Sequence, residues 1–546
     1  MVNKPAGLNT HAPGPHAGEG IYDWLRHREP RWASLAIIHR LDKETSGVLV
    51  FSKTAQANRS LTGQFTRRAV RKRYLLLTDR PVRQKEITVK SELVRSGGRY
   101  IPRPVQVGEE PAETRFRVVN SGTDRTLLEA EPVTGRTHQI RAQAAAEGFP
   151  VLGDTLYGGT PAGRVHLHAQ DITLEHPATG AEETFRAATD FSADTRLVLR
   201  SALLDAGEDD SYRLIHGASD GRPGWYVDRL GDFLLSQSER DLNEAQRARL
   251  AELMGLFSLQ GVCHKILTRQ VRRTIPLAAS PRPALGAVAP EEVVIRENGL
   301  RFALRFQEGY SVGLFLDQRE NRRRFLTGHV AAGFSLDGHD EGQRRASHEN
   351  QGSSGVSSAR SGSGASASGA LAGLEILNTF AYTCGFSVCA ARAGARTTSL
   401  DLSRKYLDWG RRNFELNGLD LAAHDFIYGE VFDWLHRFAK RGRRFDVVVL
   451  DPPTFSQSKE AGVFQAEKDY GRLVEAALPV LNPGGVLFAS TNAARLAPQL
   501  FLGRITSAVV AANRRVVQQH YVPQPPDFPV SRDEPAYLKT AWLRVG

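Results

Sequence analysis

A regular alternation of strand-like and helical patterns dominates the chain from residue 374 onward. Apolar, strand-like runs occupy residues 374–377, 397–402, 445–450 and 486–490, and helical patterns occupy residues 387–392, 404–416 and 470–481. Strands that alternate with helices pair in parallel, because each helix carries the chain back across one face of the sheet. The pattern predicts an α/β, Rossmann-like, doubly wound fold for this part of the chain.

The first 200 residues follow a different pattern. Short β-rich runs are punctuated by Gly and Pro, and long helical periods are few, which predicts an α+β fold with a mainly antiparallel sheet. A chain of 546 residues has room for about three or four domains. We expect a multidomain protein with an α+β domain at 1–198, a small α+β central domain at 199–309 and the α/β domain at 310–546.

A Ser/Gly-rich stretch interrupts the third domain. Residues 352–369 are almost all Ser, Gly and Ala, a composition that cannot form a packed core. We therefore expect a disordered insertion over residues 333–373, with no function of its own.

The charge balance indicates a polyanionic partner. Lys and Arg number 71 against 60 Asp and Glu, which gives a net charge of +11. The surplus is concentrated in residues 51–80, where Asp79 is the only acid among many Lys and Arg residues. Such a run suits RNA, although a solvated helix face would have the same composition.

Cysteine usage and hydropathy exclude several classes of protein. The 3 Cys have no CxxC spacing, so we expect neither a disulfide framework nor a metal site, and a reducing compartment. No apolar run approaches the roughly 18 residues that span a membrane, and the start does not have the pattern of a signal peptide. We expect a cytoplasmic protein without a membrane partner, and the sequence leaves an organellar location open.

Motifs in the first domain resemble those of one enzyme family. They lie at residues 2–7 (Val-Asn-Lys-Pro-Ala-Gly), 39–50 (starting His-Arg-Leu-Asp), 135–141 and 153–158. Together they resemble the RluA-type pseudouridine synthases of ribosomal and transfer RNA, over about residues 1–195. Members of that family usually have a longer segment before the Val-Asn-Lys-Pro strand, so we expect an edge strand to be missing or the start to be misassigned.

The resemblance implies roles for individual residues of this domain. Isomerising uridine requires a carboxylate nucleophile, a cation beside it and a group that handles the C5 proton. By resemblance, Asp42 is the nucleophile, Arg141 its ion-pair partner and Tyr74 the stacking and proton-handling ring, while Arg40 binds phosphate or the flipped base. Arg136 and His138 remain alternatives to Arg141, and attack on the sugar or on the base stays open.

The third domain carries a second set of motifs at the ends of its predicted strands. The turn Asn378–Gly385 follows the first strand, Asp401 ends the second, Glu430 follows a glycine, and the run Asp451-Pro452-Pro453-Thr454-Phe455-Ser456 follows a buried strand. With the run 313–319, these motifs resemble class I S-adenosylmethionine-dependent methyltransferases, most of all the large-subunit rRNA methyltransferases of the K/L and I types, over about residues 205–546.

This resemblance implies S-adenosylmethionine as the cofactor of the second half, and no cofactor for the first. An acid such as Asp401 can hold two ribose hydroxyls. The implied cofactor-binding residues are Asn378, Thr379, Phe380, Tyr382, Asp401, Glu430 and Asp451. The implied base-binding residues are Pro452, Pro453, Phe455 and Asn492, because a stiff Pro-Pro loop with an aromatic ring can grip a planar base. For Asp317 and Arg319, a cofactor or RNA contact and a structural role remain equally open.

The positions of the cysteines in the sequence indicate which base atom accepts the methyl group. Methylation of cytosine C5 needs a Cys thiolate that adds to C6. Where relatives of that type place a Cys after the fifth strand-like run, this chain has Ser490-Thr491-Asn492. We therefore predict guanine N7 as the acceptor, which requires mainly positioning, and keep cytosine C5 as the alternative.

The sequence as a whole predicts a bifunctional RNA-modifying enzyme: a pseudouridine synthase followed by a base methyltransferase, with large-subunit rRNA as the expected partner. One RNA-docking event could serve both reactions. The alternatives are that one half is degenerate and serves as an RNA-binding module, or that the methyltransferase acts on protein or small molecules. The sequence does not predict the oligomeric state.

Overall fold

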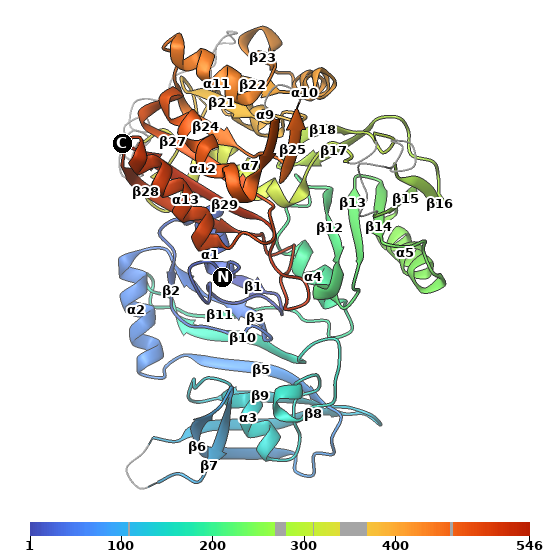
Figure 1. Ribbon diagram of the computed structural model, residues 1–546. Helices are drawn as coiled ribbons and strands as arrows, with labels where there is room; N and C mark the ends of the chain where they lie inside the picture. Colours follow the sequence, from blue (N-terminus) through green and yellow to red (C-terminus); the bar gives the residue numbers. More distant parts are fainter. Residues whose placement is uncertain (107–109, 268–279, 309–310, 339–368, 459–461) are drawn as a thin grey trace, which may run out of the picture. The chain divides into compact units, whose positions relative to one another are not determined.

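The computed structural model describes residues 1–106, 110–267, 280–308, 311–338, 369–458 and 462–546 (Figure 1). Contacts divide the chain into two compact units. Unit 1 comprises Met1–Pro13, Glu19–Arg26 and Ser34–Leu203, and unit 2 comprises Gly14–Gly18, His27–Ala33 and Leu204–Gly546. Most of the predicted disordered insertion, residues 339–368, lies outside the described residues. The prediction is wrong for its two ends, because Phe334, Leu336 and Leu371 are buried in a core cluster. None of the described helices has the length and apolar character required to cross a membrane.

One mixed sheet forms the frame of unit 1. Its strand order is β1-β3-β10-β5-β9-β8-β6-β7, and β11 pairs with β10. Among the described residues only the β3–β10 pair of this sheet is parallel. The predicted α+β, mainly antiparallel fold is therefore confirmed. The strands are β1 (Val2–Lys4), β3 (Ser46–Leu49), β5 (Arg71–Thr78), β6 (Glu86–Ser96), β7 (Arg99–Arg103), β8 (Ala112–Ser121), β9 (Thr126–Pro132), β10 (Leu167–Glu175) and β11 (Glu182–Arg186).

A glycine permits the close approach of the two parallel strands. Gly47 of β3 has φ +119°, and a Cβ atom there would lie 2.2 Å from the carbonyl oxygen of Ala169 in β10. Only glycine tolerates both the backbone conformation and the contact. Gly47, the last residue of the Thr-Ser-Gly run after Asp42, is thus needed to bring β3 against β10.

Two helices cover the sheet of unit 1 with apolar side chains. In α2 (Ala55–Thr66), Leu61 packs with Val48 and Ile172 of the strands. In α3 (Gln139–Ala146), Ile140 and Ala144 join a second core cluster. The remaining elements are α1 (Ile21–Arg28), which spans the unit boundary, α4 (Thr195–Ser201), and the short pair β2 (Ala36–Ile37) and β4 (Phe51–Ser52).

The first part of unit 2 has a sheet of its own, in the order β12-β13-β14-β15-β16. Helix α5 (Glu244–Phe257) connects the parallel strands β14 and β15 and begins with a capping box formed by Asn243 and Gln246. The strands are β12 (Ser211–His216), β13 (Trp225–Leu230), β14 (Phe233–Ser238), β15 (Gly261–Ile266) and β16 (Arg282–Gly286), followed by the hairpin β17 (Val293–Glu297) and β18 (Leu300–Leu304).

The last part of unit 2 is a doubly wound α/β domain, as predicted. Its sheet has the order β23-β22-β21-β24-β27-β29-β28, in which β29 runs antiparallel to both of its neighbours and the other pairs are parallel. The strands are β21 (Glu375–Thr379), β22 (Arg396–Asp401), β23 (Asp425–Tyr428), β24 (Phe445–Leu450), β27 (Leu481–Thr491), β28 (Val516–Pro523) and β29 (Lys539–Val545); the short hairpins are β19 (His329–Ala331) with β20 (Phe334–Ser335), and β25 (Phe455–Ser458) with β26 (Gly462–Gln465).

Helices cover both faces of this sheet. Successive residues of β24 point to opposite faces, so Val447 and Val449 join one core cluster while Val448 and Leu450 join the other. The first face packs against α7 (Arg319–Thr327), α9 (Gly385–Arg392) and α10 (Arg404–Leu416), and the second against α11 (Val431–Lys440), α12 (Ala466–Ala477) and α13 (Pro498–Ala511). The helix predicted at residues 470–481 is α12, which begins earlier, at Ala466, and ends at Ala477. It cannot extend to residue 481, because β27 starts there.

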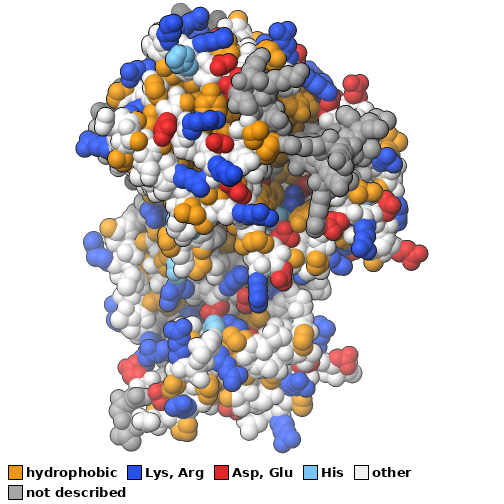
Figure 2. Space-filling view, viewed as in Figure 1, with side chains coloured by type: hydrophobic (Ala, Val, Ile, Leu, Met, Phe, Trp, Pro, Cys, Tyr) orange, Lys and Arg blue, Asp and Glu red, His pale blue; other side chains and the backbone are white. Residues whose placement is uncertain are grey.

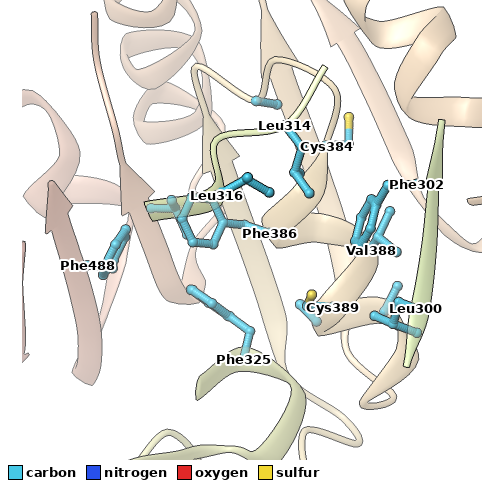
Figure 3. Close-up of a cluster of buried hydrophobic side chains, with 14 of the residues drawn as sticks. Leu300, Phe302, Leu314, Leu316, Phe325, Cys384, Phe386, Val388, Cys389 and Phe488 are labelled. Atoms are coloured by element: carbon cyan, nitrogen blue, oxygen red, sulfur yellow. The ribbon is translucent and has the colours of Figure 1, made fainter. Parts of the chain in front are cut away.

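An aromatic cluster holds α7 and α9 on the first face. Phe386 of α9 lies 5.5 Å from Phe325 of α7 and 5.3 Å from Phe488 of β27, measured between ring centroids. Figure 3 shows these rings together with Leu314 and Leu316 from the segment before α7. The segment 311–318 is thereby packed onto the α/β domain, at the end of the sheet where the cofactor motifs lie.

Candidate active sites

The predicted nucleophile of unit 1 lies on a loop that is fixed on both sides. Asp42 stands between β2 and β3. The backbone of Leu41 exchanges hydrogen bonds with the Thr10 hydroxyl, at 2.9 and 3.1 Å. On the other side, the buried Lys4 ammonium donates to the carbonyl oxygen of Lys43 at 3.2 Å. The Asp42 side chain keeps 26% of its surface exposed, so the carboxylate is held firmly and is still accessible.

Arg141 is the cation that contacts this carboxylate. Its Nη1 donates to Asp42 Oδ2 at 3.3 Å, and its Nε and Nη2 donate to Asp154 at 2.6 and 2.9 Å. Burial lowers the pKa of Arg141, but the hydrogen bonds and charges of Asp154 and Asp42 outweigh it and leave the pKa above its ordinary value. The guanidinium therefore stays charged although it is only 5% exposed.

The alternatives to Arg141 occupy other positions. His138 Nε2 lies 3.9 Å from Asp42 Oδ2, and its Nδ1 shares a hydrogen bond of 2.9 Å with the Tyr157 hydroxyl. Burial is the largest cause of a lowered pKa at His138. Arg136 is exposed and lies 3.9 Å from Glu110. Among the described residues, the cation within hydrogen-bond distance of Asp42 is Arg141.

Tyr74 lies in β5, paired with Ala130 of β9 and Ala169 of β10. Burial, with a contribution from the charge of Asp42, raises its pKa far above the neutral range, so the phenol remains protonated.

His39 stacks on Phe65 at 5.0 Å and accepts a hydrogen bond from the Val50 amide at 3.1 Å. Its pKa is lowered to about 4 by burial and by Lys72, so His39 is neutral and fixes the backbone. Arg40 is exposed at the start of the loop.

Two residues that hold this site were not singled out from the sequence, although both lie inside the quoted motifs. Asp154 orients Arg141 through two hydrogen bonds, and Lys4 donates to the carbonyl oxygens of Pro5, Leu8 and Lys43. Burial lowers the pKa of Lys4 to about 7, while the charges of Glu44 and Asp42 oppose the change. The signal available for both was a charged residue inside an otherwise uncharged motif.

In the α/β domain, the turn after β21 has an unusual backbone. Phe380, Tyr382 and Cys384 all have positive φ, at 54°, 48° and 62°. Non-glycine residues adopt this conformation at a cost, which is accepted mostly where backbone groups must face a ligand. The side chains of Asn378 and Thr379 are buried and bond to the Ser387 hydroxyl and the Val449 carbonyl. Both side chains are therefore engaged inside the domain.

The acid at the end of β22 closes this turn. Asp401 accepts hydrogen bonds from the amides of Tyr382 and Ser403, both at 2.8 Å. Burial raises the pKa of Asp401 despite these hydrogen bonds. A carboxylate has about four lone-pair directions, so Asp401 can accept a further hydrogen bond. Glu430 caps α11 through the Asp433 amide at 3.0 Å and is 9% exposed.

The loop after β24 carries the remaining predicted residues. Burial raises the pKa of Asp451 to about 6, and the charge of Asp317 adds to the rise. Gln318 Nε2 lies 3.4 Å from Asp451 Oδ2 and 2.8 Å from the Ser490 hydroxyl. Pro452 is buried. Pro453, Phe455 and Asn492 are exposed, and Asn492 accepts a hydrogen bond from the Thr454 hydroxyl.

The sequence left the roles of Asp317 and Arg319 open, and the structure shows Arg319 in a buried ion pair. It is 1% exposed and donates to Asp527 at 2.9 Å. Asp317 is half-buried and accepts a hydrogen bond from the Tyr537 hydroxyl at 2.9 Å. All the cysteines, Cys263, Cys384 and Cys389, are buried free thiols whose pKa is raised above the ordinary value by burial.

Both halves of the chain match known protein families. Residues 1–146 match the family model of RNA pseudouridylate synthases, and residues 348–544 match that of S-adenosylmethionine-dependent methyltransferases. A ribosomal RNA large subunit methyltransferase of Deinococcus radiodurans is 32% identical over 365 residues, which are 66% of this chain and 78% of the relative. The chain belongs to the ribosomal RNA large subunit methyltransferase family.

Further relatives agree with the assignment. The ribosomal RNA large subunit methyltransferase I of Klebsiella pneumoniae is 33% identical over 345 residues, 62% of this chain and 74% of the relative. The crystal structure of SMU.776, a methyltransferase complexed with SAH, has a TM-score of 0.50 and 26% identity, and the match covers 64% of this chain and 79% of that chain. This member of the family is therefore an enzyme with an RNA pseudouridine synthase domain and an S-adenosylmethionine-dependent methyltransferase domain. The predicted resemblances to these two families are confirmed, and so is S-adenosylmethionine as the cofactor of the second half.

Proposed function

We propose that the chain isomerises uridine in RNA with Asp42 as the nucleophile. The observation that carries this is the contact of Asp42 with Arg141, at 3.3 Å, between residues that lie far apart in the sequence. Arg141 places a fixed positive charge beside the carboxylate and donates a hydrogen bond to it. Asp154 holds the guanidinium in that orientation.

The neighbouring residues complete the pocket for the base. Tyr74 stays neutral, so its ring can stack on uracil and its hydroxyl can donate a hydrogen bond. A neutral phenol is a weak base, and another group has to take the C5 proton. Arg40, exposed on the same loop, is placed to bind the backbone phosphate of the everted nucleotide.

We infer that the substrate of both halves is large-subunit rRNA. The relatives in the comparisons are named as methyltransferases of that RNA. Unit 1 would add the phosphate contacts, since Figure 2 shows many Lys and Arg side chains over this unit. Strand β5 alone carries Arg71, Lys72 and Arg73, of which Arg71 is paired with Glu182 and Arg73 with Asp171. Clustered cations of this kind supply most of the sequence-independent affinity for RNA.

The residues of the α/β domain fit S-adenosylmethionine. Asp401 would hold the ribose, Glu430 the adenosine side, and the turn Asn378–Tyr382 would meet the cofactor with its backbone, beside the ring of Phe380. Asp451 lies at the adjacent strand end, near the reacting groups. When bound, the cofactor supplies a methyl group on a positively charged sulfur.

For the acceptor we propose guanine N7, gripped by the loop with Pro452, Pro453 and Phe455 and by Asn492. Support comes from the cysteines, since Cys384 and Cys389 are 0% exposed and Cys263 is 3% exposed. Because burial also raises the pKa of each thiol, no cysteine in the chain supplies an accessible thiolate for attack on cytosine C6. A ring nitrogen needs no protein nucleophile, only correct placement.

The proposal is tested on large-subunit rRNA from cells that lack the gene, incubated with the purified chain and S-adenosylmethionine. Nucleoside mass spectrometry should find new pseudouridine and new 7-methylguanosine, and borohydride–aniline treatment should cleave the RNA at the methylated guanosine. A new 5-methylcytidine or N2-methylguanosine would refute the acceptor. Pseudouridine without any methylation would show that the second half serves only to bind RNA.

A further inference from the structure

A histidine lies beside the proposed nucleophile of unit 1 with one ring nitrogen unoccupied. His138 Nε2 is 3.9 Å from Asp42 Oδ2, and the two side chains keep 19% and 26% of their surface exposed. This distance is too long for a hydrogen bond. In the part of the chain that the structure describes, Nε2 forms no hydrogen bond, so one bound nucleotide can contact both side chains.

The orientation of this imidazole is fixed by its neighbours. His138 Nδ1 shares a hydrogen bond of 2.9 Å with the Tyr157 hydroxyl, and the same oxygen accepts the Tyr100 amide at 2.9 Å. The guanidinium carbon of Arg141 lies 5.3 Å from the centre of the Tyr157 ring. His138 itself has φ 57°, a left-handed conformation that non-glycine residues adopt at a cost, often at functional sites. The ring is thus held with its unoccupied nitrogen beside the nucleophile.

The imidazole is in a state that can accept a proton. Burial, the largest cause, keeps the pKa of His138 below its ordinary value, so the ring is neutral near pH 7. The Tyr157 oxygen can accept a hydrogen bond from Nδ1, which leaves the lone pair on Nε2. Once Nε2 is protonated, the charges of Asp42 and Asp154 favour the imidazolium, while that of Arg141 opposes it. A base oriented by a neighbouring group, within reach of the substrate, is suited to general base catalysis.

The other polar groups of the site are less suited to accepting a proton from the uracil ring. The Tyr74 phenol stays protonated, because burial raises its pKa. The Nε2 atom of His39 already accepts the Val50 amide at 3.1 Å. The Lys4 ammonium donates to three carbonyl oxygens. Asp42 is engaged as the nucleophile.

We propose that His138 is the catalytic base that removes the proton from C5 of the target uridine, and that Tyr157 is its positioning residue. This inference rests on the proposed isomerisation and names the group that takes the C5 proton. When the detached base rejoins the sugar through C5, that carbon carries both the new bond and its proton. His138 Nε2 takes the proton, and the electron pair of the C5–H bond restores the C5–C6 double bond. The π pair of the C6–N1 bond returns to N1, which takes a proton from water, and the imidazolium gives its proton back to water.

The test is single-turnover isomerisation by the full-length chain of large-subunit rRNA transcripts that carry either hydrogen or deuterium at uridine C5. His138→Gly removes the ring, and glycine tolerates the φ of 57°. Pseudouridine formation should slow by at least about a hundredfold, the usual scale of general base catalysis. The deuterium isotope effect should exceed that of the wild type, because cleavage of the C5–H bond becomes the slowest step. Added imidazole should restore part of the rate, and His176→Gln, in the turn between β10 and β11, should behave as the wild type.

Tyr157→Phe tests the positioning role. Phenylalanine keeps the aromatic ring beside Arg141 but cannot accept the hydrogen bond from Nδ1, so the imidazolium is less stable and the pKa of His138 falls. The acid limb of the pH profile of kcat/KM, which reports protonation of the free enzyme's base, should therefore move to lower pH. An acid limb that stays in place would refute the role of Tyr157, since a purely structural effect lowers the rate without moving it.

An unchanged rate in His138→Gly would overturn the inference and assign the C5 proton to Asp42 or to water. A loss without a larger isotope effect, or one that imidazole leaves unchanged, would give His138 a structural role only. If His138→Gly does not fold, His138→Gln, whose amide can still bond to Tyr157, should show the same loss and the same isotope effect. Failure of the proposed isomerisation is recognised separately, because the wild type would then form no pseudouridine.

Discussion

Replacing Asp154 by asparagine separates the role of Arg141 in stability from its role in catalysis. The Arg141 and Asp154 side chains are 5% and 1% exposed, and two hydrogen bonds of 2.6 and 2.9 Å join them. Removing one partner of a buried ion pair typically costs about 3–5 kcal/mol, because the other charge stays buried. Asp42 also contacts Arg141 and offsets part of the loss, so we expect about 3 kcal/mol.

The loss should be measured by native-state hydrogen exchange of the α3 amides, since global unfolding of a multidomain chain is not a two-state process. Isomerisation should be followed by tritium release from RNA labelled at uridine C5, and we expect it to fall by at least tenfold. Glu182→Gln is the matched control. It breaks the exposed pair of Glu182 with Arg71, at 2.7 Å, and should change stability by less than about 0.5 kcal/mol.

A double variant distinguishes the two effects. Arg141→Met combined with Asp154→Leu replaces the buried pair by apolar groups, which is often neutral or stabilising, so the exchange of α3 should return toward the wild-type rate. Isomerisation should nevertheless be lost, because Asp42 has lost its cation. The reasoning would be refuted if Asp154→Asn cost less than about 1 kcal/mol and kept full activity, or if the double variant isomerised uridine.

Three further variants probe the remaining assignments. Asp42→Asn should abolish isomerisation and leave RNA affinity, measured by filter binding, nearly unchanged; turnover above a few per cent would contradict a nucleophilic role. Asp401→Ala should weaken S-adenosylmethionine binding by at least tenfold in calorimetry without affecting pseudouridine formation, and a collapse of both would show that the halves are not independent. Asp451→Asn should stop methylation and yet stabilise the domain by up to about 3 kcal/mol at pH 8. The pKa of the Asp451 carboxyl group rises from 3.8 to about 6 on folding, so the ionised group destabilises the native state. This gain should vanish below pH 4, where the wild-type group is protonated, and denaturation that showed the same gain at both pH values would exclude the explanation.

The sequence predicted the α/β domain well, since its strands and helices follow from local hydrophobic patterns. The predicted helix 404–416 and strand 445–450 agree with the bounds of α10 and β24. The strands β28 and β29 were not predicted, because one edge strand and its antiparallel partner lie outside the alternating pattern. The pairing of β29 with β27, and of β28 with β29, depends on tertiary contacts that no local window contains.

The site residues show a similar division. The contact between Asp42 and Arg141 was expected only through the resemblance, because their separation in sequence exceeds any local pattern. The clamp that Asp154 forms on Arg141 could not be foreseen. It depends on which buried cation pairs with which carboxylate, and that is decided by the packed structure.

The most direct test of the whole account is a single nucleoside analysis of large-subunit rRNA treated with the full-length chain, with and without S-adenosylmethionine. The account predicts pseudouridine in both samples and 7-methylguanosine only in the sample that contains the methyl donor. Pseudouridine that appeared only with the donor, or the absence of either nucleoside, would contradict the claim that one chain carries two independent RNA-modifying sites.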